Sequence, residues 1–161
     1  MNPDLDLTVS RIIRAPRSVV WRAWTDPARL ERWFVPAPGV VRVERLEPVA
    51  GGAFVTSFSD DGVTFGPHID GAFLVADEGE RLVYTTGLDH ELRPALDAPI
   101  AMTAVLTFDE HPDGTEFRAV VRHGDVAARA QHEEYGFADG WGAVTEQLAE
   151  LVEAEAAGVN D

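Results

Sequence analysis

The chain has 161 residues, of which 13 are basic and 28 are acidic, so its formal net charge is −15 at pH 7. It has no cysteine, and every basic residue is arginine, which excludes disulfide frameworks, thiolate metal sites and Schiff-base chemistry on lysine. The strong negative charge disfavours binding to nucleic acid or to an anionic membrane.

The length and the absence of a linker predict a single domain over residues 1–161. The opening Met-Asn-Pro-Asp-Leu-Asp-Leu carries two acids and lacks the apolar core of a secretory signal. The longest apolar runs fall far short of the ~20 residues that span a bilayer. We therefore expect a cytoplasmic protein without membrane insertion, and the arginine-only, alanine-rich composition suggests a bacterial source.

In the first part of the chain, apolar and polar residues alternate as in a strand, and apolar residues then follow at helical spacing. Leu5–Ile13 alternates as a strand does. Pro16 suits the first position of a short helix, because the missing N–H would be unpaired there. Asp26 is the expected N-cap of a second short helix, which starts at Pro27 and ends before Pro36.

The middle of the chain consists of segments with strand-like alternation, separated by turns rich in glycine, proline and aspartate. Together with the first strand they predict an antiparallel sheet of about six to seven strands. The segments are Val40–Glu47, Ala53–Ser59, Val63–Ala76, Arg81–Gly87, Ile100–Asp109 and Thr115–His123.

The last part of the chain changes to helical period. Apolar residues recur every three or four positions, which predicts one long helix from Ala127 to Ala156. Gly136, Gly140 and Gly142 would each cost about 1 kcal/mol relative to alanine inside it. Their expected use is a close approach to the sheet or a bend near the helix start. The closing Gly-Val-Asn-Asp is expected to fray.

Strands grouped together, with helices segregated from them, predict the α+β class. A curved sheet covered by one amphipathic helix leaves a volume on its concave face. That volume must be filled by bulky side chains or left as a cavity.

Specific residues also resemble a known family. The run from Ile12 to Pro27, with Leu30 and Trp33, resembles the opening of the activator-of-heat-shock-protein-ATPase-like (AHSA-type) family of the START-like (SRPBCC) superfamily. Gly140-Trp141 and the stripe after it are similar to the closing helix of that family. The resemblance implies the helix-grip fold, in which a curved antiparallel sheet wraps on a long C-terminal helix and two short helices follow the first strand.

The resemblance further implies a pocket between the sheet and the C-terminal helix that takes an apolar small molecule. We expect the pocket to be lined by inward-facing aromatic and apolar residues with a few polar groups for orientation. No cofactor, metal ligand or catalytic residue is expected. The expected ligand-binding residues are Trp33, Phe54, Phe58, Tyr84, Thr86, Met102, Leu106, Phe117, His123, Phe137 and Trp141.

Three polar features have simpler interpretations than a reactive site. His68 and Asp70 would need a third ligand to hold a metal, so a surface polar pair is favoured. His123 is expected at the rim of the sheet, hydrogen-bonded to a loop. The run 132–135 (His-Glu-Glu-Tyr) is expected to be a solvated first helical turn, because adjacent residues on a helix do not face each other.

Three functions remain open. The leading hypothesis is non-catalytic binding of a small, mostly hydrophobic molecule. The second is a cyclase or dehydratase acting in the same pocket, with His123, Tyr84 and Asp70 as its acid–base candidates. The third is a co-chaperone-like interaction domain, which is disfavoured because nothing here corresponds to the second domain of the eukaryotic activator. Exposed edge strands make a homodimer conceivable.

Overall fold

Seven strands form one antiparallel sheet in the order β1-β7-β6-β5-β4-β3-β2. The computed structural model describes residues 1–158, so the fraying expected for residues 159–161 lies outside the described residues. The strands are β1 (Asp6–Ile13), β2 (Val40–Leu46), β3 (Ala53–Ser59), β4 (Gly66–Asp77), β5 (Arg81–Thr85), β6 (Met102–His111) and β7 (Gly114–His123). The helices are α1 (Arg17–Thr25), α2 (Pro27–Leu30), α3 (Val126–Glu134) and α4 (Phe137–Ala156).

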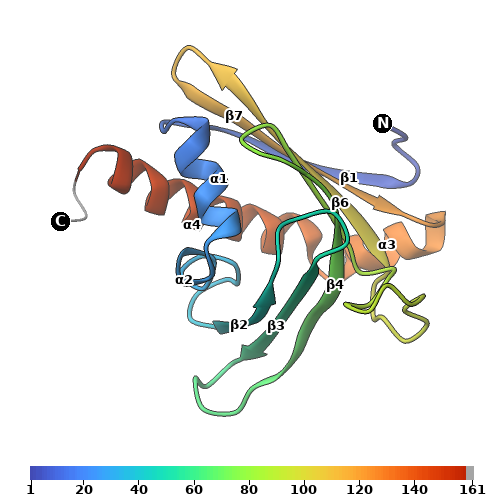
Figure 1. Cartoon of the computed structure of the whole chain (residues 1–161). Helices are drawn as coiled ribbons and strands as arrows, with labels where there is room; N and C mark the ends of the chain where they lie inside the picture. Colours follow the sequence, from blue (N-terminus) through green and yellow to red (C-terminus); the bar gives the residue numbers. More distant parts are fainter. Residues whose placement is uncertain (159–161) are drawn as a thin grey trace.

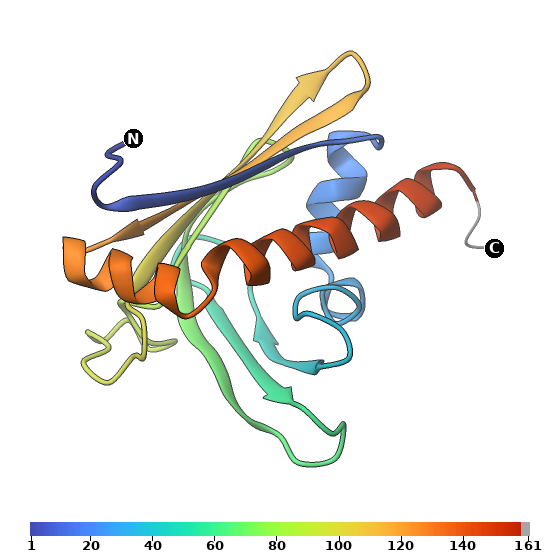
Figure 2. The ribbon, with the colours of Figure 1, turned by 180° about the vertical axis from the view of Figure 1, so that it is seen from behind.

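The sheet is a meander from β2 to β7, and β1 adds an edge strand by pairing with β7. The register shifts once in each of the pairs β2–β3, β3–β4 and β4–β5. Such bulges bend strands and increase their twist. The sheet therefore curves around the helices, and α4 lies across its concave side, as Figures 1 and 2 show from opposite directions. The α+β helix-grip fold expected from the sequence is confirmed.

The two short helices begin close to their expected positions. Asp26 caps α2, because its carboxylate accepts the backbone N–H of Ala28 at 3.0 Å. Pro16 is the N-cap of α1 and not its first helical residue: its ψ of 150° is extended, and the helix begins at Arg17. The fixed φ of proline fits both positions, so the sequence could not separate them.

The prediction of a single long helix from Ala127 to Ala156 is wrong, because this part of the chain forms two helices, α3 and α4. Gly136 lies between them with φ of 94° and ψ of 38°, a left-handed conformation that glycine adopts without the Cβ penalty. The expected bend is therefore present, at Gly136. A Cβ on Gly140 or Gly142 would meet nothing within 4 Å, so neither residue serves a close approach to the sheet.

The fourth predicted strand, Val63–Ala76, begins later than expected, at Gly66. The carboxylate of Asp61 accepts the backbone N–H groups of Val63 and Thr64 at 2.8 and 2.9 Å. These bonds hold the residues in a turn, which is the competing structure that aspartate offers the backbone.

The core lies between the concave face of the sheet and the helices α1 and α4. Trp24 of α1 stacks on Phe117 of β7, with ring centroids 6.0 Å apart, and Trp21 meets Phe108 of β6 edge-on at 5.5 Å. Helix α1 thereby fills one end of the concave face. Among residues 1–158, no helix is both long enough and apolar enough to cross a membrane.

Candidate functional site

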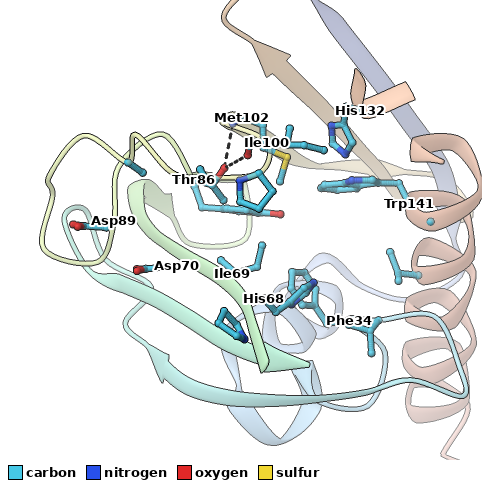
Figure 3. A pocket seen from close by; sticks show the side chains of 18 of the residues that line it. Phe34, His68, Ile69, Asp70, Thr86, Asp89, Ile100, Met102, His132 and Trp141 are labelled. Carbon is cyan, nitrogen blue, oxygen red and sulfur yellow. Dashed lines mark hydrogen bonds between the residues drawn. The ribbon is translucent and has the colours of Figure 1, made fainter. Parts of the chain in front are cut away.

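The other end of the concave face holds a cavity of about 770 Å³. It is bounded by the sheet, by α4 and by the irregular segment 86–101 that connects β5 to β6 (Figure 3). Pockets of roughly 300–1,000 Å³ are the usual size for small-molecule sites. The volume left by one helix on a curved sheet is thus open in this chain, and not filled by side chains.

The cavity wall is mostly aromatic and aliphatic. Trp24 and Trp33 meet edge to face with centroids 4.7 Å apart, and Phe34 packs on both rings at 5.7 and 5.5 Å. This cluster is held by the N–H of Trp33, which donates to the carbonyl of Ala23 at 3.0 Å. The other apolar lining residues are Val35, Pro36, Pro67, Ile69, Pro94, Ala95, Leu96, Ala98, Pro99, Ile100, Met102, Trp141 and Val144.

Two hydroxyl side chains on the sheet side of the wall differ in their hydrogen bonding. Tyr84 is buried, which raises the pKa of its phenol above the ordinary value, and its hydroxyl has no hydrogen-bond partner among the described residues. Thr86 is already occupied: its hydroxyl donates to the carbonyl of Ile100 at 2.8 Å and accepts the N–H of Met102 at 3.1 Å. Tyr84 is therefore free to contact a ligand, whereas Thr86 holds the wall together.

His68 of β4 also faces the cavity. Its Nδ1 lies 2.9 Å from the hydroxyl of Thr56, and Phe34 packs edge-on against its ring at 5.8 Å. The residue is exposed overall, although its ring packs against Phe34 and Phe58. This partial loss of solvation lowers the pKa of His68, so the side chain is neutral at pH 7.

A histidine pair stands beside the cavity at the α3 end. His123 of β7 is buried, and its Nε2 lies 2.8 Å from Nδ1 of His132 on α3. His132 lines the cavity directly above Trp141 in Figure 3. Burial, with a further contribution from His123, lowers the pKa of His132 to about 4. At neutral pH His132 is therefore uncharged.

Asp70 anchors the segment that borders the cavity. Its carboxylate accepts the backbone N–H of His90 at 2.9 Å and lies 2.8 Å from Nδ1 of the same residue. This contact raises the pKa of His90. Asp70 is thus engaged in holding segment 86–101. It does not pair with His68, and among residues 1–158 no three histidine or acidic side chains converge as a metal ion requires.

The expected ligand-binding residues divide into two groups. Trp33, Tyr84, Thr86, Met102 and Trp141 line the cavity. The structure does not bring the other six to the cavity wall; they are Phe54, Phe58, Leu106, Phe117, His123 and Phe137.

The six residues lie behind or beside the wall for identifiable reasons. Phe117 and Leu106 are on the concave face, but at the end that α1 fills. Phe54 is covered by Phe34 and Tyr84, at 5.5 and 4.9 Å between ring centroids. Strand alternation gives the face on which a residue lies, and not which helix or ring covers it.

The other three expected residues that do not line the cavity lie at its periphery. Phe58 packs on His68 at 6.0 Å, and Phe137 stacks on Trp141 at 5.6 Å. His123 was expected to hydrogen-bond to a loop, and its ring contacts the carbonyl of Leu5, in the turn before β1, at 2.8 Å.

Sequence reasoning missed several wall residues. His132 was expected in a solvated first turn, and that expectation is wrong: it lies in the last turn of α3 and faces the cavity. Segment 86–101 contributes eight further lining positions and has no periodic pattern to reveal them. No signal in the sequence pairs His123 with His132.

A model of the Activator of Hsp90 ATPase homolog 1-like protein family matches residues 14–153 of the chain. The chain belongs to this family. The family resemblance drawn from the first helix, the second short helix and Gly140-Trp141 is thereby confirmed. Membership of the Activator of Hsp90 ATPase homolog 1-like family fits a ligand-binding domain in general terms.

Solved structures agree with this assignment. A crystal structure of a protein from Nitrosomonas europaea is 36% identical, with a TM-score of 0.87 over 96% of this chain and 98% of the other. A crystal structure from Chromobacterium violaceum is 27% identical, with a TM-score of 0.72 over 92% and 98%. An AHSA1-like protein from Aeromonas hydrophila, at 19% identity and a TM-score of 0.65 over 97% and 96%, shares the fold. No curated protein matches the chain.

Proposed function

We propose that this protein binds a small, mostly hydrophobic molecule in the cavity between the sheet and α4. The observation that carries the proposal is the cavity of about 770 Å³ walled largely by tryptophan, phenylalanine and aliphatic side chains. Water gains few hydrogen bonds in such a space, so an apolar ligand that displaces it is favoured by about 25 cal/mol per Å² of apolar surface removed from water.

The cyclase or dehydratase alternative receives less support from the same geometry. Of its acid–base candidates, His123 does not reach the wall, and Asp70 is bound to His90. Tyr84 does reach the wall, but burial raises the pKa of its phenol, which makes it a weaker acid. The co-chaperone-like alternative has its own test: a chaperone complex recovered in a pulldown would favour it over the cavity as the functional site.

Two glycines on α4 provide a matched test. Gly140 lines the cavity, whereas Gly142 does not, and a Cβ at either position meets nothing within 4 Å. A leucine at residue 140 therefore extends into the cavity without straining the helix, while a leucine at residue 142 changes the same helix elsewhere. Both replacements raise helix propensity, so loss of folding does not explain a difference between them.

The measurement is the fluorescence of Nile red, an uncharged dye that brightens in apolar surroundings, titrated with wild-type protein, Gly140→Leu and Gly142→Leu. We expect wild-type protein and Gly142→Leu to bind the dye equally, and Gly140→Leu to bind it at least about tenfold more weakly, the equivalent of 1.4 kcal/mol. Native mass spectrometry of freshly purified protein should show an added mass that is lost on denaturation. Equal dye binding by both variants would contradict the proposal.

A further inference from the structure

The histidine pair beside the cavity has a hydrogen-bonding direction that the structure determines. The carbonyl oxygen of Leu5 can only accept, so the hydrogen of its 2.8 Å contact with His123 must reside on Nδ1 of His123. The backbone N–H of His123 donates to the same oxygen at 3.1 Å. Two bonds to one carbonyl fix both the position of His123 at the end of β7 and the orientation of its ring.

The tautomer of His132 follows from that of His123. In the neutral imidazole one nitrogen carries hydrogen and the other accepts, so Nε2 of His123 is an acceptor. Its partner at 2.8 Å, Nδ1 of His132, must therefore donate. This leaves Nε2 of His132 without hydrogen, as a free acceptor. The order of donation runs from His132 through His123 to the carbonyl of Leu5.

Packing holds the His132 ring in place. The ring meets His123 edge to face at 5.1 Å and Phe137 of α4 at 5.1 Å, so contacts from two elements restrict its rotation. Nε2 of His132 has no hydrogen-bond partner among residues 1–158, and the residue lines the cavity. The lowered pKa of His132 agrees with an uncharged ring whose free nitrogen accepts.

The side chains labelled beside this acceptor are apolar or already paired. Met102 and Trp141 flank it in Figure 3, and the hydroxyl of Thr86 on the nearby wall is committed to Ile100 and Met102. Tyr84 can donate or accept, so it does not discriminate between ligand groups. A donor on the ligand would satisfy His132, whereas an apolar or acceptor-only group placed there would leave its nitrogen desolvated and unpaired, at a cost.

We infer that His132, oriented by His123, selects apolar ligands that carry an O–H or N–H donor, such as an alcohol, phenol or amide, over ligands of the same shape that lack one. The inference rests on the proposed function, since it concerns the same cavity. His132 acts as a ligand-contacting residue, and His123 acts as a positioning residue through it.

The test compares 2-naphthol with 2-methoxynaphthalene. Both carry an oxygen on the same carbon of naphthalene, but in the methoxy compound a methyl group replaces the hydroxyl hydrogen, so only the naphthol can donate a hydrogen bond. Each is used to displace Nile red at about pH 7.5, where a histidine of ordinary pKa is largely neutral. We expect wild-type protein to prefer the naphthol by roughly 3- to 10-fold, the range of one net hydrogen bond. His132→Phe should lose the preference and still bind the methoxy compound. His111→Phe, which changes a histidine outside the cavity, should retain it.

The possible failures are distinguishable. If neither naphthalene nor the dye binds wild-type protein, the proposed function fails. If both compounds bind wild-type protein equally, or if His132→Phe keeps the preference, the cavity still binds ligands and only the inference about His132 is overturned. Nitrogen-15 NMR of the imidazoles gives a second readout that needs no variant: we expect hydrogen on Nδ1 and none on Nε2 of His132, and hydrogen found on Nε2 would overturn the inference.

Discussion

Gln147 of α4 shows how a single side chain joins distant parts of this fold. Its amide nitrogen donates to the carbonyls of Trp33 and Val35 at 2.9 and 2.8 Å, and its amide oxygen accepts the N–H of Ala37 at 2.8 Å. These three bonds connect the segment after α2 to α4, and this segment supplies Trp33 and Val35 to the cavity wall. The bonds match the capacity of an amide, with two donors and one acceptor used.

We expect Gln147→Leu to lower the free energy of unfolding by about 1–3 kcal/mol, because it leaves backbone groups of the half-buried segment without partners. Urea denaturation monitored by tryptophan fluorescence measures the change. Gln131→Leu is the control: its amide contacts only the exposed hydroxyl of Tyr135, so a change within about 0.5 kcal/mol is expected. An equal effect of the two substitutions would mean that the three bonds contribute nothing.

At the scale of elements, the break between α3 and α4 determines where the cavity can form. Because Gly136 turns the chain, α3 packs against β7 and β1 while α4 crosses the sheet at a different angle (Figure 2). The turn places His132 at the end of α3 and Trp141 in the second turn of α4, on the same cavity wall. A continuous helix would carry both residues on one axis and could not present them in this way.

Opposite effects of alanine at two glycines test this break. Gly136→Ala should destabilise the protein by about 1 kcal/mol, because a Cβ is strained at a φ of 94°. Gly142→Ala should stabilise it by about 0.5–1 kcal/mol, because Gly142 is helical with open space at its Cβ. Both are measured by urea denaturation. A stabilising Gly136→Ala would show that the helix continues through residue 136.

At the scale of the whole molecule, the net charge of −15 opposes compaction. Ion pairs such as Arg29 with Asp26 and Glu155 offset it locally, but they are largely at the surface, where each contributes little. Long-range repulsion among the remaining acids is therefore the larger electrostatic effect on stability.

Salt should consequently stabilise this protein. Between about 0.01 M and 1 M NaCl the Debye length falls from about 30 Å to about 3 Å, which screens the repulsion. We expect the free energy of unfolding to rise by on the order of 1 kcal/mol over this range, measured by urea denaturation. Sucrose at equal osmolality controls for non-ionic effects. A fall in stability with NaCl would mean that attractive surface pairs outweigh the repulsion.

Much of the architecture could be predicted from the sequence, because its signals are local. Alternation at Arg81–Gly87 and Thr115–His123, the turn residues between strands, and the Asp26-Pro27 start of α2 depend on neighbours in the chain. The family resemblance rested on the same kind of local signal. Such signals gave five residues of the cavity wall: Tyr84 and Met102 lie on strands, Trp141 lies on α4, and Trp33 and Thr86 lie just beyond α2 and β5.

Only the tertiary structure decided which inward-facing residues border the cavity. Phe117 and Met102 both face the concave side, yet α1 covers the first and leaves the second open. The pairing of His123 with His132 likewise needed the turn at Gly136 and the packing of Phe137. Composition, period and turn chemistry are properties of short stretches of chain and are written in the sequence. What covers a given side chain depends on elements far away along the chain, and so does the space left between them.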